Sequence, residues 1–192
     1  MTANNEVEVK FKVANIEKLV ARLRDLGLHP LTPRTQEMNV LFDLPGHPLR
    51  KRGDLLRLRK YGEAWVLTHK AKSKTAQNGP HKTRLETETR VQDGAKMETI
   101  LRSLQFEPVF RYEKFRAEWA AEKGHVVIDE TPIGNFAEIE GPPEWIDSVA
   151  KNLGVTPEQY ITETYAGLFS AWKERSKSKA QEMTFEAVAN NP

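Results

Sequence analysis

The feature that most constrains the fold is a charged side chain at every second position, repeated in six segments along the chain. In the first segment, Glu6, Glu8 and Lys10 alternate with Val7 and Val9. The other segments contain Arg57 and Arg59, Lys70 and Lys72, Arg84 with Glu86 and Glu88, Lys114 and Arg116, and Glu138 and Glu140. Successive side chains on a strand point to opposite faces, so each segment predicts a strand with one charged and one mainly apolar face.

The order of elements predicts an α+β chain. After the first segment, the predicted strands, which include the other five charged segments and are bounded by Gly, Pro and polar turn residues, fall at 36–43, 55–60, 64–71, 81–91, 109–121, 125–130 and 135–140. Apolar residues at helical spacing predict helices at 16–26, 93–106, 144–153 and 157–172. We interpret residues 1–173 as one domain. Residues 174–192 are polar and Ala-rich, which predicts a weakly ordered extension with a short helix at 183–188.

Composition narrows the class of protein. No run approaches the roughly 20 apolar residues of a membrane span, and residues 1–10 show no secretory pattern. The chain has no cysteine, so disulfides and thiolate metal sites are excluded. Because no export signal is seen, a cytoplasmic location is the default expectation. Residues 50–90 hold twelve Lys and Arg residues against four acidic ones, whereas acidic residues dominate 129–144. A basic middle followed by an acidic segment fits a polyanionic partner with metal ions, but also a solvated surface.

The alternating strands allow two architectures. In a flat sheet packed on helices, the charged face is simply exposed to water. In a closed barrel, the apolar positions face outward under helices and the charged positions line the lumen. The second arrangement needs partners for its charges. A triphosphate with divalent cations would supply them, because Arg and Lys bind phosphate oxygens and carboxylates bind Mg²⁺ or Mn²⁺.

The residues also carry a resemblance to a known family. EVEVK, residues 6–10, resembles the ExExK signature of the CYTH superfamily, the triphosphate tunnel metalloenzymes. The segments NVLFD, LLRLRK, WVLTHKAK, RLETE, EKFR, VVID and GNFAEIEG resemble the later strand motifs of that family, in the same order. The match covers about residues 6–172. It implies a closed or nearly closed antiparallel eight-stranded β-barrel, with the polar face inside and helices packed on the outside.

The resemblance implies roles for the charged residues. The implied ligands of Mg²⁺ or Mn²⁺ are Glu6, Glu8, Glu86, Asp129, Glu138 and Glu140. The implied triphosphate contacts are Lys10, Arg57, Arg59, Lys70, Arg84, Lys114 and Arg116. Of these, we assign catalytic roles to Glu6, Glu8, Lys10 and Glu138. Glu130 faces the other way on its strand and is expected to be structural. We interpret Tyr165 as part of an apolar core stripe on the last long helix.

Three functions remain open. The first is metal-dependent hydrolysis of tripolyphosphate, thiamine triphosphate or a nucleoside triphosphate, in which a metal-activated water attacks the terminal phosphorus. The second is a class IV adenylyl cyclase, in which the ribose 3′-OH of ATP attacks the α-phosphorus and releases pyrophosphate. The third is a non-catalytic polyphosphate or nucleotide-binding module. We favour hydrolysis, because it demands less of the site.

Partners and other enzyme classes are also constrained. A small-molecule triphosphate is the expected partner, with no membrane, and a homodimer is compatible with such barrels. The basic runs lack the interleaved aromatic residues typical of nucleic-acid binding, so we expect no nucleic acid. The chain lacks the P-loop, HExxH and GxSxG patterns, which argues against a P-loop enzyme, a zinc hydrolase and a serine hydrolase.

Overall fold

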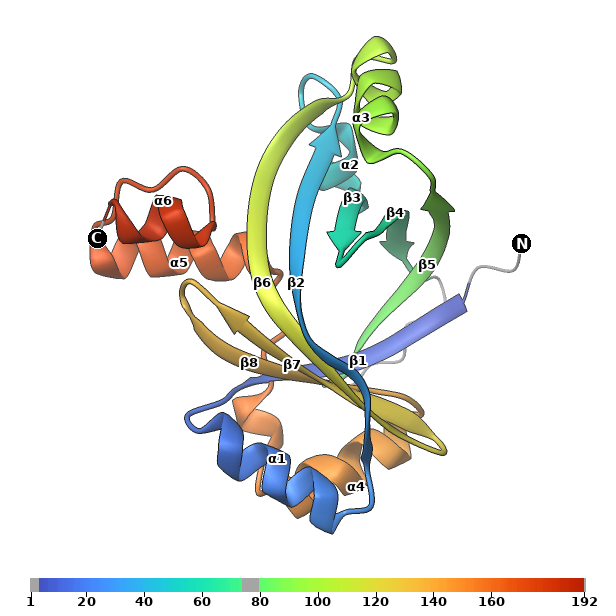
Figure 1. Ribbon diagram of the computed structural model, residues 1–192, viewed down its shortest axis with the longest axis vertical. Coiled ribbons are helices and arrows are strands. Elements are labelled where there is room, and N and C mark those ends of the chain that lie inside the picture. Colours follow the sequence, from blue (N-terminus) through green and yellow to red (C-terminus); the bar gives the residue numbers. More distant parts are fainter. Residues whose placement is uncertain (1–3, 74–79, 192) are drawn as a thin grey trace.

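Eight antiparallel strands form a closed barrel in the computed structural model, which describes residues 4–73 and 80–191 (Figure 1). The strands are β1 (Asn4–Lys12), β2 (His29–Asp43), β3 (Leu55–Tyr61), β4 (Ala64–Lys72), β5 (Lys82–Val91), β6 (Glu107–Ala121), β7 (Gly124–Thr131) and β8 (Gly134–Glu140). Around the barrel their order is β1-β5-β4-β3-β2-β6-β7-β8, and β1 closes the ring by pairing with both β5 and β8. The predicted α+β fold with a closed eight-stranded barrel is confirmed.

The strand register places the alternating charges on the inner face. Glu8 lies opposite Glu140, and Lys10 lies opposite Glu138, across the β1–β8 pair. Residues directly opposite each other in neighbouring strands point to the same face of a sheet. Val9 is buried in an apolar cluster under the helices, so the even-numbered positions of β1 point into the barrel.

Two helices cover one side of the barrel. Helices α1 (Ile16–Asp25) and α4 (Pro143–Leu153) lie next to each other beneath β1, β7 and β8 (Figure 1). They share a buried cluster with the outward apolar positions of these strands, including Leu23, Val126, Ile139 and Ile146. The start of α1 is capped by Asn15, whose side chain accepts a hydrogen bond from the Lys18 backbone N–H. The apolar alternation of the strands is therefore matched by the apolar stripes of these two helices.

Helices α2 (Pro48–Arg52) and α3 (Gly94–Ser103) lie near the ends of β2, β3 and β5 (Figure 1). The α3 helix begins after Asp93, whose side chain accepts a hydrogen bond from the Lys96 backbone N–H. Leu101 of α3 packs against Phe42 and Leu58 in a second buried cluster.

The C-terminal region differs from the sequence prediction. The helix predicted at 157–172 is split into a 3₁₀ turn, Pro157–Gln159, and α5, Tyr165–Ser176. Between them the chain is extended, and the Ile161 N–H donates a 2.8 Å hydrogen bond to the Lys10 carbonyl of β1. The apolar residues have the same spacing whether this segment is helical or extended. The spacing therefore could not reveal that a hydrogen bond to β1 replaces a hydrogen bond within a helix.

Residues 177–191 also pack more firmly than the weakly ordered extension that the sequence predicts. Helix α6 (Phe185–Ala189) overlaps the predicted short helix and lies beside α5 (Figure 1). Met183 is fully buried among Tyr112, Phe136 and Phe169. Its backbone N–H donates to the Arg111 carbonyl, and its carbonyl accepts from the Glu113 N–H, both at 3.0 Å. The polar composition conceals this anchoring, because one buried side chain and two backbone hydrogen bonds supply it.

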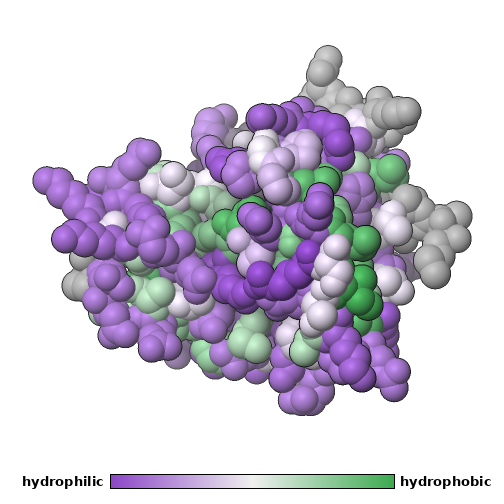
Figure 2. Space-filling view, turned by 90° about the horizontal axis from the view of Figure 1, so that it is seen from above, coloured by the Kyte–Doolittle hydropathy of each residue, from purple (hydrophilic) through white to green (hydrophobic). Residues whose placement is uncertain are grey.

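Seen from above, the surface is mainly hydrophilic, with apolar side chains showing in smaller patches between the charged ones (Figure 2). Across the described ranges, none of the helices has both the length and the apolar character required to cross a bilayer.

Candidate functional site

A cavity of about 270 Å³ lies inside the barrel and is lined by charged side chains of both signs. We call it the tunnel cavity. Its basic residues are Lys10, Arg57, Arg59, Lys70, Lys82, Lys114 and Arg116. Its acidic residues are Glu6, Glu8, Glu86, Glu88, Glu118, Glu138 and Glu140. The barrel thus concentrates into one enclosed space charges that are spread over most of the sequence.

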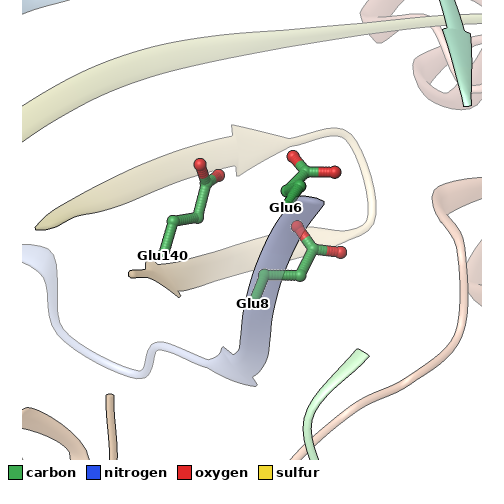
Figure 3. Close-up of side chains that lie close together, drawn as sticks. All are labelled: Glu6, Glu8 and Glu140. Atoms are coloured by element: carbon green, nitrogen blue, oxygen red, sulfur yellow. The ribbon is translucent and has the colours of Figure 1, made fainter. Parts of the chain in front are cut away.

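Three carboxylates converge within the tunnel cavity. Glu6 and Glu8 extend from β1 and Glu140 extends from β8, with their carboxylate groups turned toward one another (Figure 3). One oxygen of each lies within 4.8 Å of the other two. Oxygen donors in such a cluster suit a hard divalent cation such as Mg²⁺ or Mn²⁺. Three of the six predicted metal ligands therefore lie together.

Two lysine side chains offset part of the charge of this cluster. Lys70 Nζ lies 2.6 Å from Glu6 Oε2, and Lys82 Nζ lies 2.5 Å from Glu8 Oε1. Burial raises the pKa of Glu6; Lys70 opposes this, and the nearby carboxylates of Glu8 and Glu86 raise the pKa further. The cluster therefore has surplus negative charge that a divalent cation would relieve.

Glu86, also a predicted ligand, lies next to the cluster. Its carboxylate is 3.1 Å from Lys70 Nζ and 3.9 Å from Arg57 Nη2. Lys70 of β4 thereby contacts both Glu6 of β1 and Glu86 of β5, the strand that lies between β1 and β4. Glu86 is placed to orient Lys70 beside the three-carboxylate cluster.

Two predicted metal ligands, Asp129 and Glu138, are instead engaged by basic groups. Lys114 and Arg116 bind Asp129 at 2.9 and 2.7 Å, and the Tyr165 hydroxyl donates to it at 2.6 Å. Glu138 pairs with Lys10 at 3.2 Å and with Arg116 at 2.7 Å. Burial alone would raise the pKa of Glu138, but Lys10 and Arg116 hold it well below its usual value.

These contacts change the interpretation of Asp129. It is fully buried and does not line the tunnel cavity, whereas Glu138 does. The sequence prediction follows from the family resemblance, which implies acidic residues on the two final strands but does not specify their depth. In the structure, Asp129 supports Lys114 and Arg116 from behind.

Six of the seven predicted triphosphate contacts line the tunnel cavity. They are Lys10, Arg57, Arg59, Lys70, Lys114 and Arg116. The exception is Arg84, whose guanidinium donates to the Gly53 carbonyl and which lines a neighbouring cavity. Arg84 lies near the start of β5, at the end of the barrel where β3 begins, so its long side chain reaches the rim.

Besides Lys82 and Glu118, which line the tunnel cavity, two buried residues at the site were missed by sequence reasoning. Glu37 of β2 is fully buried and lies 3.3 Å from Lys114, 3.8 Å from Arg116 and 3.9 Å from Arg59. Strand alternation places Glu37 on the same face as Asn39 in the predicted strand at 36–43. A single acidic residue on a strand is common, so this pattern did not single it out. Burial alone would raise the pKa of Glu37, and the surrounding basic groups instead lower it far below its usual value.

Tyr165 is the second missed residue. Helical spacing places it on a core stripe, and it does pack against Tyr112 and Phe136. Its ring also lies under Lys10 Nζ, 4.2 Å from the ring centroid, while its hydroxyl reaches Asp129. Tyr165 thus closes one side of the tunnel cavity as the first residue of α5. By contrast, Glu130 points outward as predicted and pairs with Arg34 at 2.6 Å.

Comparison with known proteins agrees with this fold. A protein of Methanocaldococcus jannaschii named "putative adenylate cyclase" is 29% identical over 179 residues, covering 85% of this chain and 97% of that protein. The structure of a protein from Vibrio parahaemolyticus, also described as a "putative adenylate cyclase", superposes with a TM-score of 0.74 at 16% identity, covering 88% of this chain and 99% of the other.

A third likeness is to a Hippeastrum protein described as a "putative adenylyl cyclase" with a dominant triphosphatase activity. Its TM-score is 0.58 at 20% identity, with 88% of this chain and 96% of that chain covered. The CYTH domain family matches residues 4–165, most of the chain. The chain therefore belongs to the CYTH domain family.

Proposed function

We propose that the protein is a divalent-metal-dependent triphosphatase that binds the triphosphate inside the barrel. One observation carries this proposal: the tunnel cavity pairs a three-carboxylate cluster with seven basic side chains in one enclosed space. Phosphoryl transfer needs positioning and neutralisation of the phosphate oxygens more than it needs covalent chemistry. The arrangement of basic and acidic groups supplies both.

Two pairs of basic residues differ in the groups that hold them. Lys114 and Arg116 are buried and are held from behind by Asp129 and Glu37, so their positions are defined before any ligand binds. Such preorganised groups stabilise charge without reorganising during the reaction. Lys70 and Lys82 instead pair with the carboxylate cluster and are placed to turn to a phosphate when that cluster is otherwise neutralised.

Glu6, Glu8 and Glu140 are the residues that would hold Mg²⁺ or Mn²⁺, which when bound neutralises phosphate oxygens and supplies an activated water. The chain's own part is to orient the triphosphate along Lys10, Arg57, Arg59, Lys114 and Arg116. The terminal phosphoryl group is then transferred to water.

A second candidate is adenylyl cyclase activity, which the name of the Methanocaldococcus relative favours. The same basic residues of the tunnel cavity would bind ATP, but the ribose 3′-OH would be the nucleophile and pyrophosphate would be the leaving group. Hydrolysis is preferred because water needs no dedicated positioning of a ribose. The triphosphatase activity described for the Hippeastrum protein gives hydrolysis a precedent on this fold.

Product analysis separates these candidates. Purified protein is incubated with Mg²⁺ or Mn²⁺ and tripolyphosphate, thiamine triphosphate, ATP or GTP, and the products are resolved by ³¹P NMR. We expect metal-dependent orthophosphate that is lost in Glu8→Gln and kept in Glu130→Gln, whose side chain points outward. Cyclic AMP with stoichiometric pyrophosphate would establish the cyclase instead. Binding without turnover would indicate a non-catalytic binding module.

A further inference from the structure

A second cavity, of about 540 Å³, adjoins the tunnel cavity at the end of the barrel where α2 and the start of α5 lie. We call it the vestibule. Six residues line both cavities, namely Leu41, Leu55, Lys70, Lys82, Thr164 and Ala166. Its volume falls within the range of about 300–1,000 Å³ that is usual for small-molecule sites. A ligand held by the tunnel cavity can therefore extend into the vestibule.

The vestibule differs from the tunnel cavity in the chemistry of its wall. Leu49 of α2, Val109 and Phe110 of β6, and Phe169 of α5 give it a mainly apolar surface. The rings of Phe110 and Phe169 lie 5.7 Å apart between centroids. Val109 is 43% exposed although it is apolar. Exposed apolar and aromatic surface inside a concave site favours an apolar or aromatic group of a ligand.

The charges at the vestibule favour a neutral group over a cationic one. Arg50, Arg84 and Lys173 are basic residues of its lining. The two carboxylates of the lining are engaged by the protein itself. Asp43 accepts hydrogen bonds from three backbone N–H groups, and Asp54 pairs with an arginine of α2 at 3.0 Å. Lys70 and Lys82 line the vestibule as well, so an organic cation would meet five positive side chains and no unengaged carboxylate among these lining residues.

We propose that the vestibule holds a neutral aromatic group joined to the triphosphate, so that the substrate is a nucleoside triphosphate. This inference rests on the proposed function for the position of the triphosphate. Lys70 and Lys82 line the junction of the two cavities and would contact the phosphate nearest the nucleoside. Tripolyphosphate would leave the vestibule empty, and thiamine triphosphate would bring a cationic ring into its basic lining.

The test is a binding comparison that does not depend on turnover. Dissociation constants are measured by isothermal titration calorimetry without divalent metal, for tripolyphosphate, ATP and thiamine triphosphate. The variant is Ser170→Trp, because Ser170 is exposed on α5 and lines the vestibule but not the tunnel cavity. The matched control is Ala171→Trp, at the next residue of α5, which is exposed and lines neither cavity.

We expect Ser170→Trp to weaken ATP binding about tenfold, corresponding to the loss of roughly 1.4 kcal/mol of contact free energy, and to leave tripolyphosphate within about twofold. Ala171→Trp should change neither. The wild-type protein should bind ATP more tightly than thiamine triphosphate. If Ser170→Trp does not fold, Val109→Glu, at the exposed apolar wall, should show the same selectivity.

Equal effects on ATP and tripolyphosphate, or no effect on either, would overturn the vestibule proposal, as would thiamine triphosphate binding as tightly as ATP. These outcomes are distinct from a failure of the proposed function. If the protein releases orthophosphate but Ser170→Trp affects ATP and tripolyphosphate equally, the triphosphatase proposal is retained and only the nucleoside site is rejected. If Ser170→Trp selectively weakens ATP binding but the protein shows no turnover, the triphosphatase proposal is rejected and the nucleoside site is retained.

Discussion

Glu37 Oε1 lies 3.3 Å from Lys114 Nζ, and neither side chain is more than 1% exposed. Glu37 also approaches Arg116 and Arg59, and one of its oxygens has no hydrogen-bond partner among the described residues. A buried carboxylate in this position offsets the repulsion among the positive charges of Lys114, Arg116 and Arg59. It also holds these side chains in place before a ligand binds. Lys114 and Arg116 are therefore held by Glu37 on one side and Asp129 on the other.

Replacing Glu37 by Gln should strongly destabilise the protein. The change removes the negative charge but keeps the shape, and leaves Lys114 and Arg116 with less compensation in the buried interior. Breaking a buried ion pair on one side typically costs about 3–5 kcal/mol. Urea unfolding at pH 7 would measure the loss in the free energy of unfolding. The control is Glu63→Gln, whose carboxylate is 98% exposed and should change this free energy by less than about 0.5 kcal/mol.

The same carboxylate predicts how stability depends on pH. The pKa of Glu37 is lower in the folded protein than in the unfolded chain, where it is about 4.3. Its contribution is therefore fully present above the unfolded pKa and is lost as the pH falls below it toward the folded value. Stability measured from pH 7 to pH 3 should fall less steeply in Glu37→Gln than in the wild type. An identical slope in the two proteins would contradict the assignment.

Removing the Tyr165 hydroxyl should destabilise the group formed by Asp129, Lys114 and Arg116. Tyr165→Phe keeps the ring beneath Lys10 but deletes the 2.6 Å hydrogen bond to buried Asp129. Hydrogen bonds to charged groups contribute about 1.5–3 kcal/mol, so thermal and urea unfolding should show a loss in that range. The outward-lying Tyr160→Phe serves as the comparison and should lose less. Equal losses would show that the hydroxyl of Tyr165 has no special role.

Replacing Asp43 should loosen the segment that carries α2. Its carboxylate accepts hydrogen bonds from the backbone N–H groups of Leu44, Leu49 and Arg50, at 2.8–3.0 Å. Burial alone would raise the pKa of Asp43, but these donors lower it below its usual value. Asp43→Ala should cost about 1–3 kcal/mol at pH 7, and the difference from wild type should shrink as acid protonates the wild-type carboxylate. Hydrogen exchange of the Leu49 and Arg50 amides would locate the change.

Truncating Met183 tests whether the C-terminal segment is anchored. Met183→Ala removes a fully buried side chain and should cost about 2–5 kcal/mol. Met38→Ala, at a residue that is 38% exposed, is the matched change and should cost much less. Limited proteolysis should then cut the segment after α5 in Met183→Ala and spare it in Met38→Ala. Early cleavage of the wild-type protein would instead favour the loose extension expected from composition.

Weakening the carboxylate cluster should weaken metal binding. Glu8→Gln removes one charge from the three groups that lie within 4.8 Å. Loss of an outer partner of a metal site already costs about 10–100-fold in affinity, and a direct ligand should cost at least as much. Titration of Mn²⁺ followed by electron paramagnetic resonance would measure this. Glu130→Gln should keep wild-type affinity, and equal affinity in Glu8→Gln would move the metal elsewhere.

The inner face of the barrel could be predicted from the sequence because strand alternation is a local property. The parity of Glu6, Glu8 and Lys10 specifies a shared face, and the ordered strand motifs specify the architecture. Depth and partner choice are not local. Strand parity could not distinguish Asp129, which contacts Lys114, from Glu140, which joins the three-carboxylate cluster. That difference depends on which strands become neighbours when the barrel closes.

Helical spacing had a similar limit at the C-terminal end. The spacing that predicts a core stripe correctly places Tyr165 against apolar residues, but it carries no information about the hydroxyl group. Only the approach of α5 to β7 brings that hydroxyl to Asp129. The buried Met183 illustrates the same point, because a single apolar residue in a polar segment gives no periodic signal.

The most direct test of a metal-dependent triphosphatase is the fate of solvent oxygen. The protein is incubated with Mg²⁺ in H₂¹⁸O and with whichever triphosphate it turns over, and the products are analysed by mass spectrometry. Attack of water on the terminal phosphorus predicts one ¹⁸O atom in the released orthophosphate and none in the remaining diphosphate product. Cyclic AMP with unlabelled pyrophosphate, or the absence of metal-dependent turnover, would contradict the proposed function.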